Sequence, residues 1–388
     1  MFHLTSGQGS DHLVALVKCE GYQDAWEALS FGVDLIGGIE HFCVQDEALL
    51  LKPNLLLGDS PERGSTTHPA VFEAAARVFS SGGARLFYGD SPGFGSPQAA
   101  VKSSGLANIA KQYGISLADF GEMLDTPNPD GILLKKFQIA KGLSEVDGVI
   151  NLPKFKTHAL TRLTGAVKNL FGCLPGVQKT AFHARLSDET HFSEMLLDLA
   201  ELINPRLHIM DGILAMEGNG PRNGQLRKVG VILLSTNPHA LDYCAARIMN
   251  LDPGLVPTLK AAQMHGLLVP QRIEILGDPL ETFVIEDFDV NRSKASTTGK
   301  QRFYMPMLNQ WVTPKPMIDE TKCTRCGRCV SICPVKPKAL GFLNGRVQSP
   351  QYNYERCIRC YCCQEMCPDE AISIKTPLIG RLLNELKI

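Results

Sequence analysis

Residues 323–334 read CTRCGRCVSICP, and residues 357–368 read CIRCYCCQEMCP. Each stretch holds three cysteines with two residues between them, a fourth cysteine after three further residues, and then a proline. The second stretch begins 34 residues after the first, so one unit is repeated. Nine of the 13 cysteines in the chain lie in this region. Dense cysteine in a reducing compartment predicts metal binding rather than disulfides.

The repeated unit resembles the bacterial two-cluster ferredoxin domain. In that pattern three closely spaced thiolates wrap one 4Fe–4S cubane, and the cysteine before proline ligates the other cubane. The resemblance implies two 4Fe–4S clusters with crossed ligand sets: Cys323, Cys326, Cys329 and Cys367 for the first, and Cys357, Cys360, Cys363 and Cys333 for the second. Zinc in all-cysteine sites is the alternative, but the triple run with Cys-Pro favours iron–sulfur. The extra Cys362 is interpreted as a buried small residue or a spare thiol.

Overall charge excludes one class of function and is unevenly distributed. The 388 residues carry 39 Lys and Arg against 40 Asp and Glu, which argues against a nucleic-acid binder. Residues 316–388, however, hold eleven basic and seven acidic side chains. Three of the arginines, Arg325, Arg328 and Arg359, lie inside the cysteine loops. They are interpreted either as groups that tune the clusters or dock an acidic partner, or as solvated surface charges.

No apolar run reaches the ~18–20 residues of a membrane span. The first twelve residues lack the basic stretch followed by an apolar one that marks a secretory signal. We therefore predict a cytoplasmic protein without a membrane span.

The first 285 residues alternate between strand-like and helix-like stretches. The strand-like runs are 12–17, 48–51, 85–88, 146–151, 207–210, 229–234 and 272–276, and the helix-like stretches are 22–36, 69–80, 97–113, 187–202 and 240–249. This alternation predicts an α/β domain with a largely parallel sheet. Functional loops of such a domain gather at the carboxyl ends of its strands.

Four parts of the chain are predicted from these patterns. They are an α/β domain at 1–285, a linker at 286–315, a small α+β ferredoxin-like domain with two clusters at 316–376 and a helical tail at 377–388. Small polar residues at 291–300 indicate the linker. Apolar residues at helical spacing indicate that the tail is a packing helix.

The segment from Asn151 to His183 is unusually basic. It contains four lysines, two histidines and one arginine, but no acidic residue. An ordinary surface mixes both signs of charge, so this segment predicts a cationic site for a carboxylate or phosphate ligand. The alternative is a basic face that docks on the acidic remainder of the domain.

Other polar groups follow predicted strands and complete the candidate site. We assign Lys168, His183, His158 and Asp211 as candidate catalytic residues, and Lys52, Asn54, His68, Lys154, Lys156, Thr157, Asn169 and Lys179 as candidate ligand-binding residues. For Asp211 the alternative is a turn residue at a strand end. Asp242 is a further candidate acid, and the alternative for it is a first-turn helix acid that interacts with the helix dipole.

Seven short motifs together resemble one family. They are Lys52-Pro-Asn54, Thr67-His68-Pro69, Gly89-Asp90-Ser91-Pro92, Asn151-Leu-Pro-Lys154, Lys156-Thr157-His158, Gly165-Ala-Val-Lys168-Asn169 and Asn219-Gly220-Pro221. The family is the domain of unknown function 362, found in anaerobic bacteria and archaea, many members of which carry the same ferredoxin pair. The resemblance implies this architecture and iron–sulfur redox chemistry, but no substrate.

A second, partial resemblance is to nickel-pincer lactate racemases. Gly165-Ala-Val-Lys168, Pro175-Gly176 and His183 are similar to a Gly-Gly-Arg-Lys…Pro-Gly…His pattern of those enzymes, with Ala-Val in place of the Gly-Arg pair. It implies that Lys168 and His183 face a small organic acid or cofactor.

Three functional hypotheses follow. The first is an iron–sulfur oxidoreductase in which two 4Fe–4S clusters exchange electrons with an anionic substrate or partner at the Lys/His site. The second is a non-catalytic electron carrier or assembly factor that recognises a partner protein. The third is a racemase-like acid/base enzyme with structural clusters. Fold alone does not choose among them.

Overall fold

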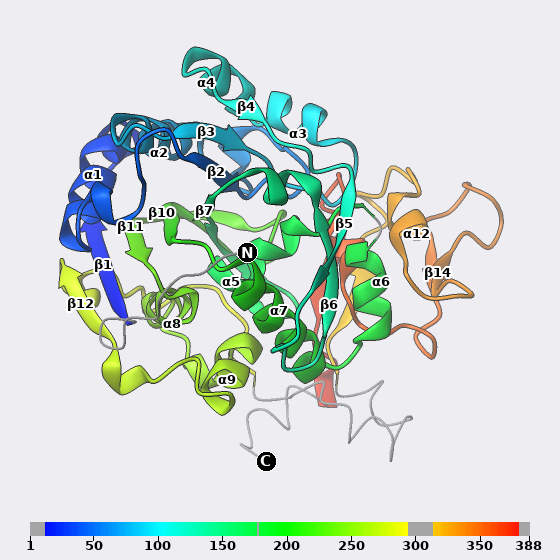
Figure 1. Ribbon diagram of the computed structural model, residues 1–388. Helices are drawn as coiled ribbons and strands as arrows, with labels where there is room; N and C mark the ends of the chain where they lie inside the picture. The colour runs from blue at the N-terminus through cyan, green and yellow to red at the C-terminus, as the bar shows by residue number, and fades with distance from the viewer. Residues whose placement is uncertain (1–11, 177, 294–312, 380–388) are drawn as a thin grey trace.

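A mixed, mostly parallel sheet of ten strands forms the centre of the α/β domain (Figure 1). The computed structural model describes residues 12–176, 178–293 and 313–379. The main strands lie in the order β12-β1-β11-β10-β7-β2-β3-β4, and β8 and β9 are attached beside β10. Within the described part of this sheet, antiparallel pairing is limited to β1–β11, β10–β11 and β8–β9. The predicted fold class is confirmed.

The strands of this sheet are β1 (Leu13–Lys18), β2 (Ala48–Pro53), β3 (Arg85–Tyr88), β4 (Ser116–Leu117), β7 (Gly148–Leu152), β8 (Lys154–His158), β9 (Arg162–Thr164), β10 (Leu207–Glu217), β11 (Gln225–Ser235) and β12 (Glu274–Gly277). The helices are α1 (Ala25–Leu35), α2 (Pro69–Ser81), α3 (Pro97–Ser103), α4 (Leu106–Gln112), α5 (Ala166–Asn169), α6 (Gln178–Arg185), α7 (Glu189–Ile203), α8 (Pro238–Ile248) and α9 (Pro257–Met264). A separate hairpin consists of β5 (Met123–Pro127) and β6 (Lys136–Ala140).

Apolar side chains cover both faces of the sheet. Alternate residues of β1 belong to different cores: Val14 and Leu16 pack with α5, α7, α8 and α9, whereas Ala15 and Val17 pack with α1 and α2. This alternation follows from the two-residue period of a strand. A strand buried on both faces reads as a continuous apolar run, as observed in the sequence.

Two predicted elements differ from the structure. The stretch 97–113 is divided into α3 and α4 at Gly105, which adopts a left-handed φ of 80° that glycine tolerates. The strand expected to end near Met210 continues as β10 to Glu217, because β8 and β11 both pair with this extension. Asp211 therefore lies inside a strand and not at its end.

Three neighbouring parallel strands bring the candidate loops together. β2 pairs with both β3 and β7, and Lys52 lies opposite Asn151. Parallel strands end at the same edge of a sheet. The loops after β2, β3 and β7 thus meet at one edge, as the sequence predicted.

The C-terminal module contains two short antiparallel strand pairs and two short helices. Its elements are β13 (Lys315–Ile318), α12 (Arg328–Ile332), β14 (Leu340–Gly341), β15 (Gln351–Tyr352), α13 (Cys362–Glu365) and β16 (Ile372–Lys375). In Figure 1, α12 and β14 lie at the opposite edge of the molecule from β12.

Most of the predicted linker and tail, residues 294–312 and 380–388, lies outside the described residues. The predicted division into four parts stays a prediction. In the portions of the chain that the structure covers, no helix has the length and apolar character needed to cross a membrane.

Candidate functional site

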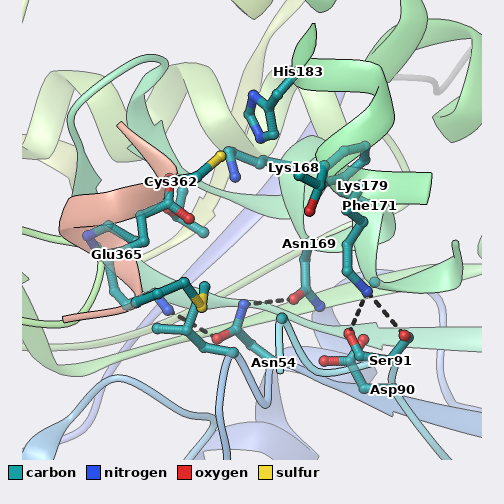
Figure 2. A pocket seen from close by; sticks show the side chains of 18 of the residues that line it. Asn54, Asp90, Ser91, Lys168, Asn169, Phe171, Lys179, His183, Cys362 and Glu365 are labelled. Carbon is teal, nitrogen blue, oxygen red and sulfur yellow. Dashed lines mark hydrogen bonds between the residues drawn. The ribbon is translucent and has the colours of Figure 1, made fainter. Parts of the chain in front are cut away.

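A cavity lies between the carboxyl edge of the sheet and the C-terminal module (Figure 2). It is partly open to solvent, and its empty space of about 710 Å³ includes some of that solvent. On the α/β side it is lined by Asn54, Leu56, Asp90, Ser91, Gly93, Lys156, Thr164, Lys168, Asn169, Phe171, Gly172, Lys179, Thr180, His183 and Pro221. The module contributes Ile332, Cys362, Glu365 and Met366.

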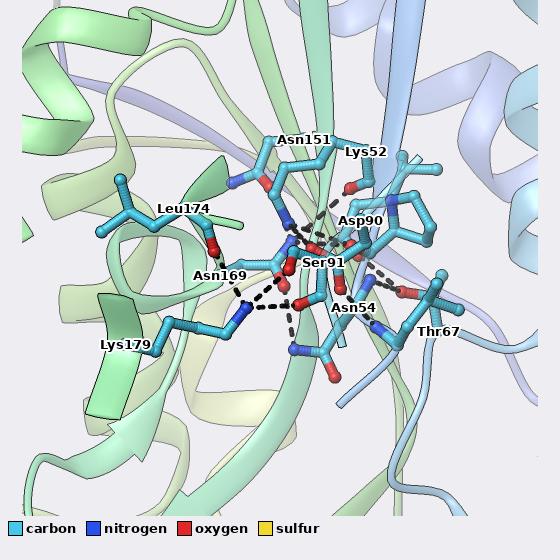
Figure 3. A network of polar contacts seen from close by, with 12 residues as sticks. Lys52, Asn54, Thr67, Asp90, Ser91, Asn151, Asn169, Leu174 and Lys179 are labelled. Atoms are coloured by element: carbon cyan, nitrogen blue, oxygen red, sulfur yellow. Dashed lines mark hydrogen bonds and ion pairs between the residues drawn. The ribbon is translucent and has the colours of Figure 1, made fainter. Parts of the chain in front are cut away.

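A buried polar network forms the floor of the cavity (Figure 3). The Lys52 ammonium pairs with the Asp90 carboxylate at 2.7 Å, and both side chains are almost completely buried. The Lys179 ammonium donates to Ser91 Oγ and to the Ser91 and Leu174 carbonyl oxygens, at 2.8–3.0 Å. Buried charges require such partners because desolvation penalises them. Lys52 therefore links β2 to the loop after β3, and Lys179 links that loop to the segment that follows α5.

A chain of amide groups connects this floor to Lys156. The Lys156 ammonium donates to Asn54 Oδ1 at 2.8 Å and to the Ser65 carbonyl oxygen at 2.6 Å. Asn54 Nδ2 donates to Asn169 Oδ1, and Asn169 Nδ2 donates to Asn151 Oδ1. Burial, with smaller contributions from neighbouring lysines, lowers the pKa of Lys156 to about 7.

The short helix α5 is positioned by Asp242. Its carboxylate accepts hydrogen bonds from the backbone N–H groups of Ala166 and Val167, which are unsatisfied donors at the helix start. A Cβ at Gly165 would overlap this carboxylate, so glycine is required there. Burial raises the pKa of Asp242 to about 7. Asp242 thus orients the helix that carries Lys168; it accepts from the start of α5 and does not lie in the first turn of its own helix, α8, as the helix-acid interpretation expected.

Three polar side chains at the cavity lack a hydrogen-bond partner within the described ranges. They are the Lys168 ammonium, which lies 5.7 Å from the Phe171 ring centroid, the His183 imidazole and the buried hydroxyl of Thr164. Burial lowers the pKa of Lys168, and it lowers the pKa of His183 to about 3. The site therefore presents an ammonium group without a hydrogen-bond partner, a neutral imidazole and a free hydroxyl to any bound molecule.

His158 contacts the module directly. Its Nδ1 accepts hydrogen bonds from the backbone N–H groups of Leu160 and Thr161, so the ring proton resides on Nε2. Nε2 lies 3.0 Å from Glu365 Oε1. Burial lowers the pKa of His158 to about 4, so the ring is neutral. Burial alone would raise the pKa of Glu365, but His158 and Lys168 hold it below its ordinary value.

Six candidate residues lie outside the residues that line the cavity: Lys52 and His158, described above, and four others. Lys154 and Asp211 are directly opposite each other in β8 and β10, and their side chains form a buried ion pair at 2.8 Å. The His68 ring stacks on Tyr22 at 3.5 Å, and its backbone N–H donates to Asp211. Thr157 Oγ1 donates to the Gly218 carbonyl oxygen. These contacts account for the four side chains structurally, and their predicted functional roles remain untested.

The eight predicted cluster ligands line two small cavities of the module. One is lined by Cys323, Cys326, Cys329 and Cys367, and the other by Cys333, Cys357, Cys360 and Cys363. These are the crossed sets expected from the sequence. The thiols of each set surround one space, so the residues present fit a cubane in each cavity.

Polar contacts fix the module on the α/β domain. The fully buried Gln364 donates from Nε2 to the Asn219 and Gly220 carbonyl oxygens and to Asn219 Oδ1, at 2.8–3.2 Å. Arg222 donates to the Cys367 carbonyl oxygen at 2.8 Å and pairs with Asp59. Asn219 Nδ2 donates to the Ile372 carbonyl oxygen. The motif Asn219-Gly220-Pro221 therefore docks the module, a role that sequence reasoning did not assign.

Sequence reasoning predicted as site residues six of those that line the cavity, namely Asn54, Lys156, Lys168, Asn169, Lys179 and His183, but it missed Glu365, Met366 and Ile332 of the module. These three residues lie beside cysteines whose spacing indicated metal ligation, so their own side chains gave no separate signal. Glu365 had one usable signal: an acidic residue between two ligands of an otherwise basic module.

The fold and the cysteine cavities define an α/β protein with a C-terminal ferredoxin-type iron–sulfur module. The model of the family described as domain of unknown function (DUF362) matches residues 49–247, and that of a 4Fe-4S dicluster domain matches residues 315–368. The chain belongs to the DUF362 family and carries a 4Fe–4S dicluster domain.

One curated relative and two solved structures are similar to this chain. The thylakoid-associated protein sll1697 of Synechocystis sp. is 37% identical over 257 residues, which cover 66% of this chain and 79% of the relative. The lactate racemase apoprotein of Thermoanaerobacterium thermosaccharolyticum has a TM-score of 0.42 at 11% identity, covering 61% of this chain and 57% of that one. A protein from Thermotoga maritima has a TM-score of 0.35 at 12% identity, with coverage of 65% and 61%. The chain thus spans less than two thirds of either solved structure.

Proposed function

We propose that this protein is an iron–sulfur oxidoreductase that exchanges electrons with a small organic anion bound in the cavity. One observation carries the proposal: the same cavity is lined by the unpaired Lys168 and by Cys362 and Glu365, which flank predicted cluster ligands. A ligand there contacts the cationic site and the iron–sulfur module at once. A carrier that only recognises a partner protein requires no such enclosed space.

Two 4Fe–4S clusters, held by the crossed cysteine sets, supply one-electron transfer when bound. Reduction of one double bond in the ligand takes two electrons, which two molecules of a reduced one-electron carrier protein provide, and two protons. Lys168 supplies one proton, since burial lowers its pKa, and solvent supplies the other.

Side chains of the α/β domain bind the anion. The Lys168 ammonium pairs with a carboxylate or phosphate oxygen, and Thr164 donates its free hydroxyl hydrogen. Lys156 and Lys179 add positive charge, because their own partners are amide, hydroxyl and carbonyl oxygens. Of the two lining carboxylates, Asp90 pairs with Lys52, whereas Glu365 faces the neutral His158 and offsets part of the positive charge of the three lysines. The cavity is thus left with positive charge for a ligand to neutralise.

A panel experiment tests the proposed function. The full chain is reconstituted with iron and sulfide, reduced, and mixed anaerobically with small carboxylates and phosphate esters while the reduced-cluster EPR signal is followed. We expect at least one compound to reoxidise the clusters in a saturable manner, and Lys111→Ala, an exposed change on α4, to behave as native. If every compound leaves the signal unchanged and none binds the oxidised protein, the chain is a carrier and the proposal is wrong.

The affinity for the anionic ligand is expected to fall as pH rises through about 7 to 8. Burial lowers the pKa of Lys156 to about 7 and that of Lys179 to about 8. Binding favours the charged ammonium form, and both groups lose their proton above these values. The charged groups that act on them are Lys154, Lys168, Asp59 and Glu365 for Lys156, and Asp90, Lys52 and Lys168 for Lys179.

The measurement is the dissociation constant of a compound found with the panel, determined calorimetrically from about pH 6 to about pH 9. The matched comparison is a Lys156→Met variant, which should lose the part of the dependence centred near pH 7. An affinity that is constant or that rises over this range would contradict the prediction.

A further inference from the structure

The loops of the iron–sulfur module at 321–354 carry an excess of positive charge, although Asp369 lines the same cluster cavity as Arg325. Residues 321–354 contain no Asp or Glu. They contain six cationic side chains, all of them exposed: Lys322, Arg325, Arg328, Lys336, Lys338 and Arg346. A solvated surface ordinarily mixes both signs of charge. A patch of one sign produces a directed field that attracts a partner of the opposite sign.

Three of these arginines lie next to the exposed Cys326 in the chain or against its loop. Arg325 and Cys326 line the same cluster cavity. The Arg346 guanidinium lies 3.2 Å from the position that a Cβ of Gly327 would occupy, so it sits against the loop between Cys326 and Arg328. The Arg328 guanidinium in turn lies 5.6 Å from the ring centroid of the exposed Phe94. We call Arg325, Arg328 and Arg346 the arginine rim.

Exposed apolar side chains accompany the rim. Leu343 and Val347, each 72% exposed, lie on the same loop as Arg346. Large aliphatic side chains at such exposure are typical of contact surfaces when charged residues border them. The combination of a small apolar contact with surrounding cations suits a short-lived electron-transfer complex, which buries less area than a stable one.

The arginine rim and the ligand cavity are connected through α12. Arg328 begins this helix and lies against Phe94, and Ile332 at its end lines the cavity together with residues of α13. Arg325 and Cys326 precede α12 and line the cluster cavity instead, and α12 and β14 lie at the outer edge of the molecule in Figure 1.

We propose that the arginine rim docks an acidic one-electron carrier protein, which delivers electrons to the cluster held by Cys323, Cys326, Cys329 and Cys367. Each transfer oxidises the carrier by one electron and reduces this cluster by one electron, with no bond made or broken. The proposal does not depend on which ligand the cavity binds. It requires only the predicted ligand set and the position of Cys326 at the surface.

Association with a probe carrier tests the proposal. The probe is an acidic bacterial two-cluster ferredoxin, and a basic c-type cytochrome serves as its counterpart of opposite charge. Binding of the oxidised proteins is measured by interferometry over a range of salt concentrations. We expect the acidic probe to bind, its affinity to fall steeply with salt, and the basic probe not to bind. Salt-independent binding of the acidic probe would overturn the proposal.

Two triple variants distinguish the effect of the arginine rim on binding from the effect of overall charge. The triple change Arg325→Glu, Arg328→Glu and Arg346→Glu should reduce affinity for the acidic probe at least ~100-fold. The control triple Lys111→Glu, Arg247→Glu and Lys260→Glu makes the same charge change on exposed positions of α4, α8 and α9, and should have a much smaller effect. An equal loss in both triples means that net charge alone acts, and the proposal is then wrong.

A milder variant and a second assay test whether the substitutions disturb the folding of the module. The milder triple Arg325→Gln, Arg328→Gln and Arg346→Gln should show an intermediate loss. Reduction by a methyl viologen radical, which needs no docking site, should proceed at the native rate in all variants. If viologen reduction is native but the acidic ferredoxin binds and reduces the glutamate triple as well as native protein, the carrier docks elsewhere.

Discussion

A double change of Cys333→Ala and Cys360→Ala is expected to remove one cluster and leave the other intact. Both cysteines line the same cavity, together with Cys357 and Cys363. A second double change, Cys326→Ala with Cys333→Ala, is expected to damage both clusters. Its two cysteines lie close in sequence but line different cavities. The two variants remove equal numbers of thiols, so only the crossed ligand assignment makes their outcomes differ.

Iron content and EPR of the reconstituted full chain measure this difference. The native protein should hold about eight irons, and Cys333→Ala/Cys360→Ala about four with one reduced-cluster signal. Cys326→Ala/Cys333→Ala should lose most of both signals. Cys362→Ser is the matched control, because Cys362 lines the ligand cavity and neither cluster cavity. If the outcomes are reversed, each cysteine run holds its own cluster and the crossed assignment fails.

Local sequence spacing accounts for the features that were predicted well. A cluster loop is a short-range structure, so the positions of its cysteines nearly determine which thiols meet. Buried parallel strands likewise appear as apolar runs, and 85–88 coincides with β3. Because parallel strands end at one edge, the sequence also placed Asn54, Lys168 and the loop after β3 near one another.

Pairing between distant segments accounts for what was missed. The sequence predicted that Lys154 and Asp211 act on a ligand. In the structure their side chains form an ion pair with each other, because β8 pairs with β10. His158 was predicted as a catalytic group, and its actual neighbour, Glu365, is 207 positions away in the chain. Only three-dimensional packing decides which member of a charged cluster is left without a partner. The composition predicted the positive charge of the site, but it did not predict that Lys168, rather than Lys154, is the lysine without a hydrogen-bond partner.

The second large effect, a loss of affinity for the anion, is expected for Lys168→Ala. Its ammonium has no ion-pair or hydrogen-bond partner among the described residues and lines the cavity. A hydrogen bond to a charged group contributes about 1.5–3 kcal/mol. Its loss corresponds to a decrease of roughly 10- to 150-fold in affinity for the anion. Lys168→Arg should retain much of the binding because it keeps the charge, and the dissociation constant is measured calorimetrically with the oxidised full chain.

A structural role of Lys168 makes a different prediction. Lys168 acts electrostatically on Glu365, so in a structural role its removal weakens the docking of the module and distorts the cavity. In that case Glu365→Gln, which removes the charge that Lys168 balances, should restore both the unfolding midpoint and anion affinity in the double variant. Because Glu365→Gln removes a negative charge that lines the cavity, the double variant is compared with the Glu365→Gln single variant. If Lys168 binds the anion itself, the double variant binds more weakly than the single variant even when both have the native unfolding midpoint. Equal affinity in the two variants would rule out direct binding by Lys168.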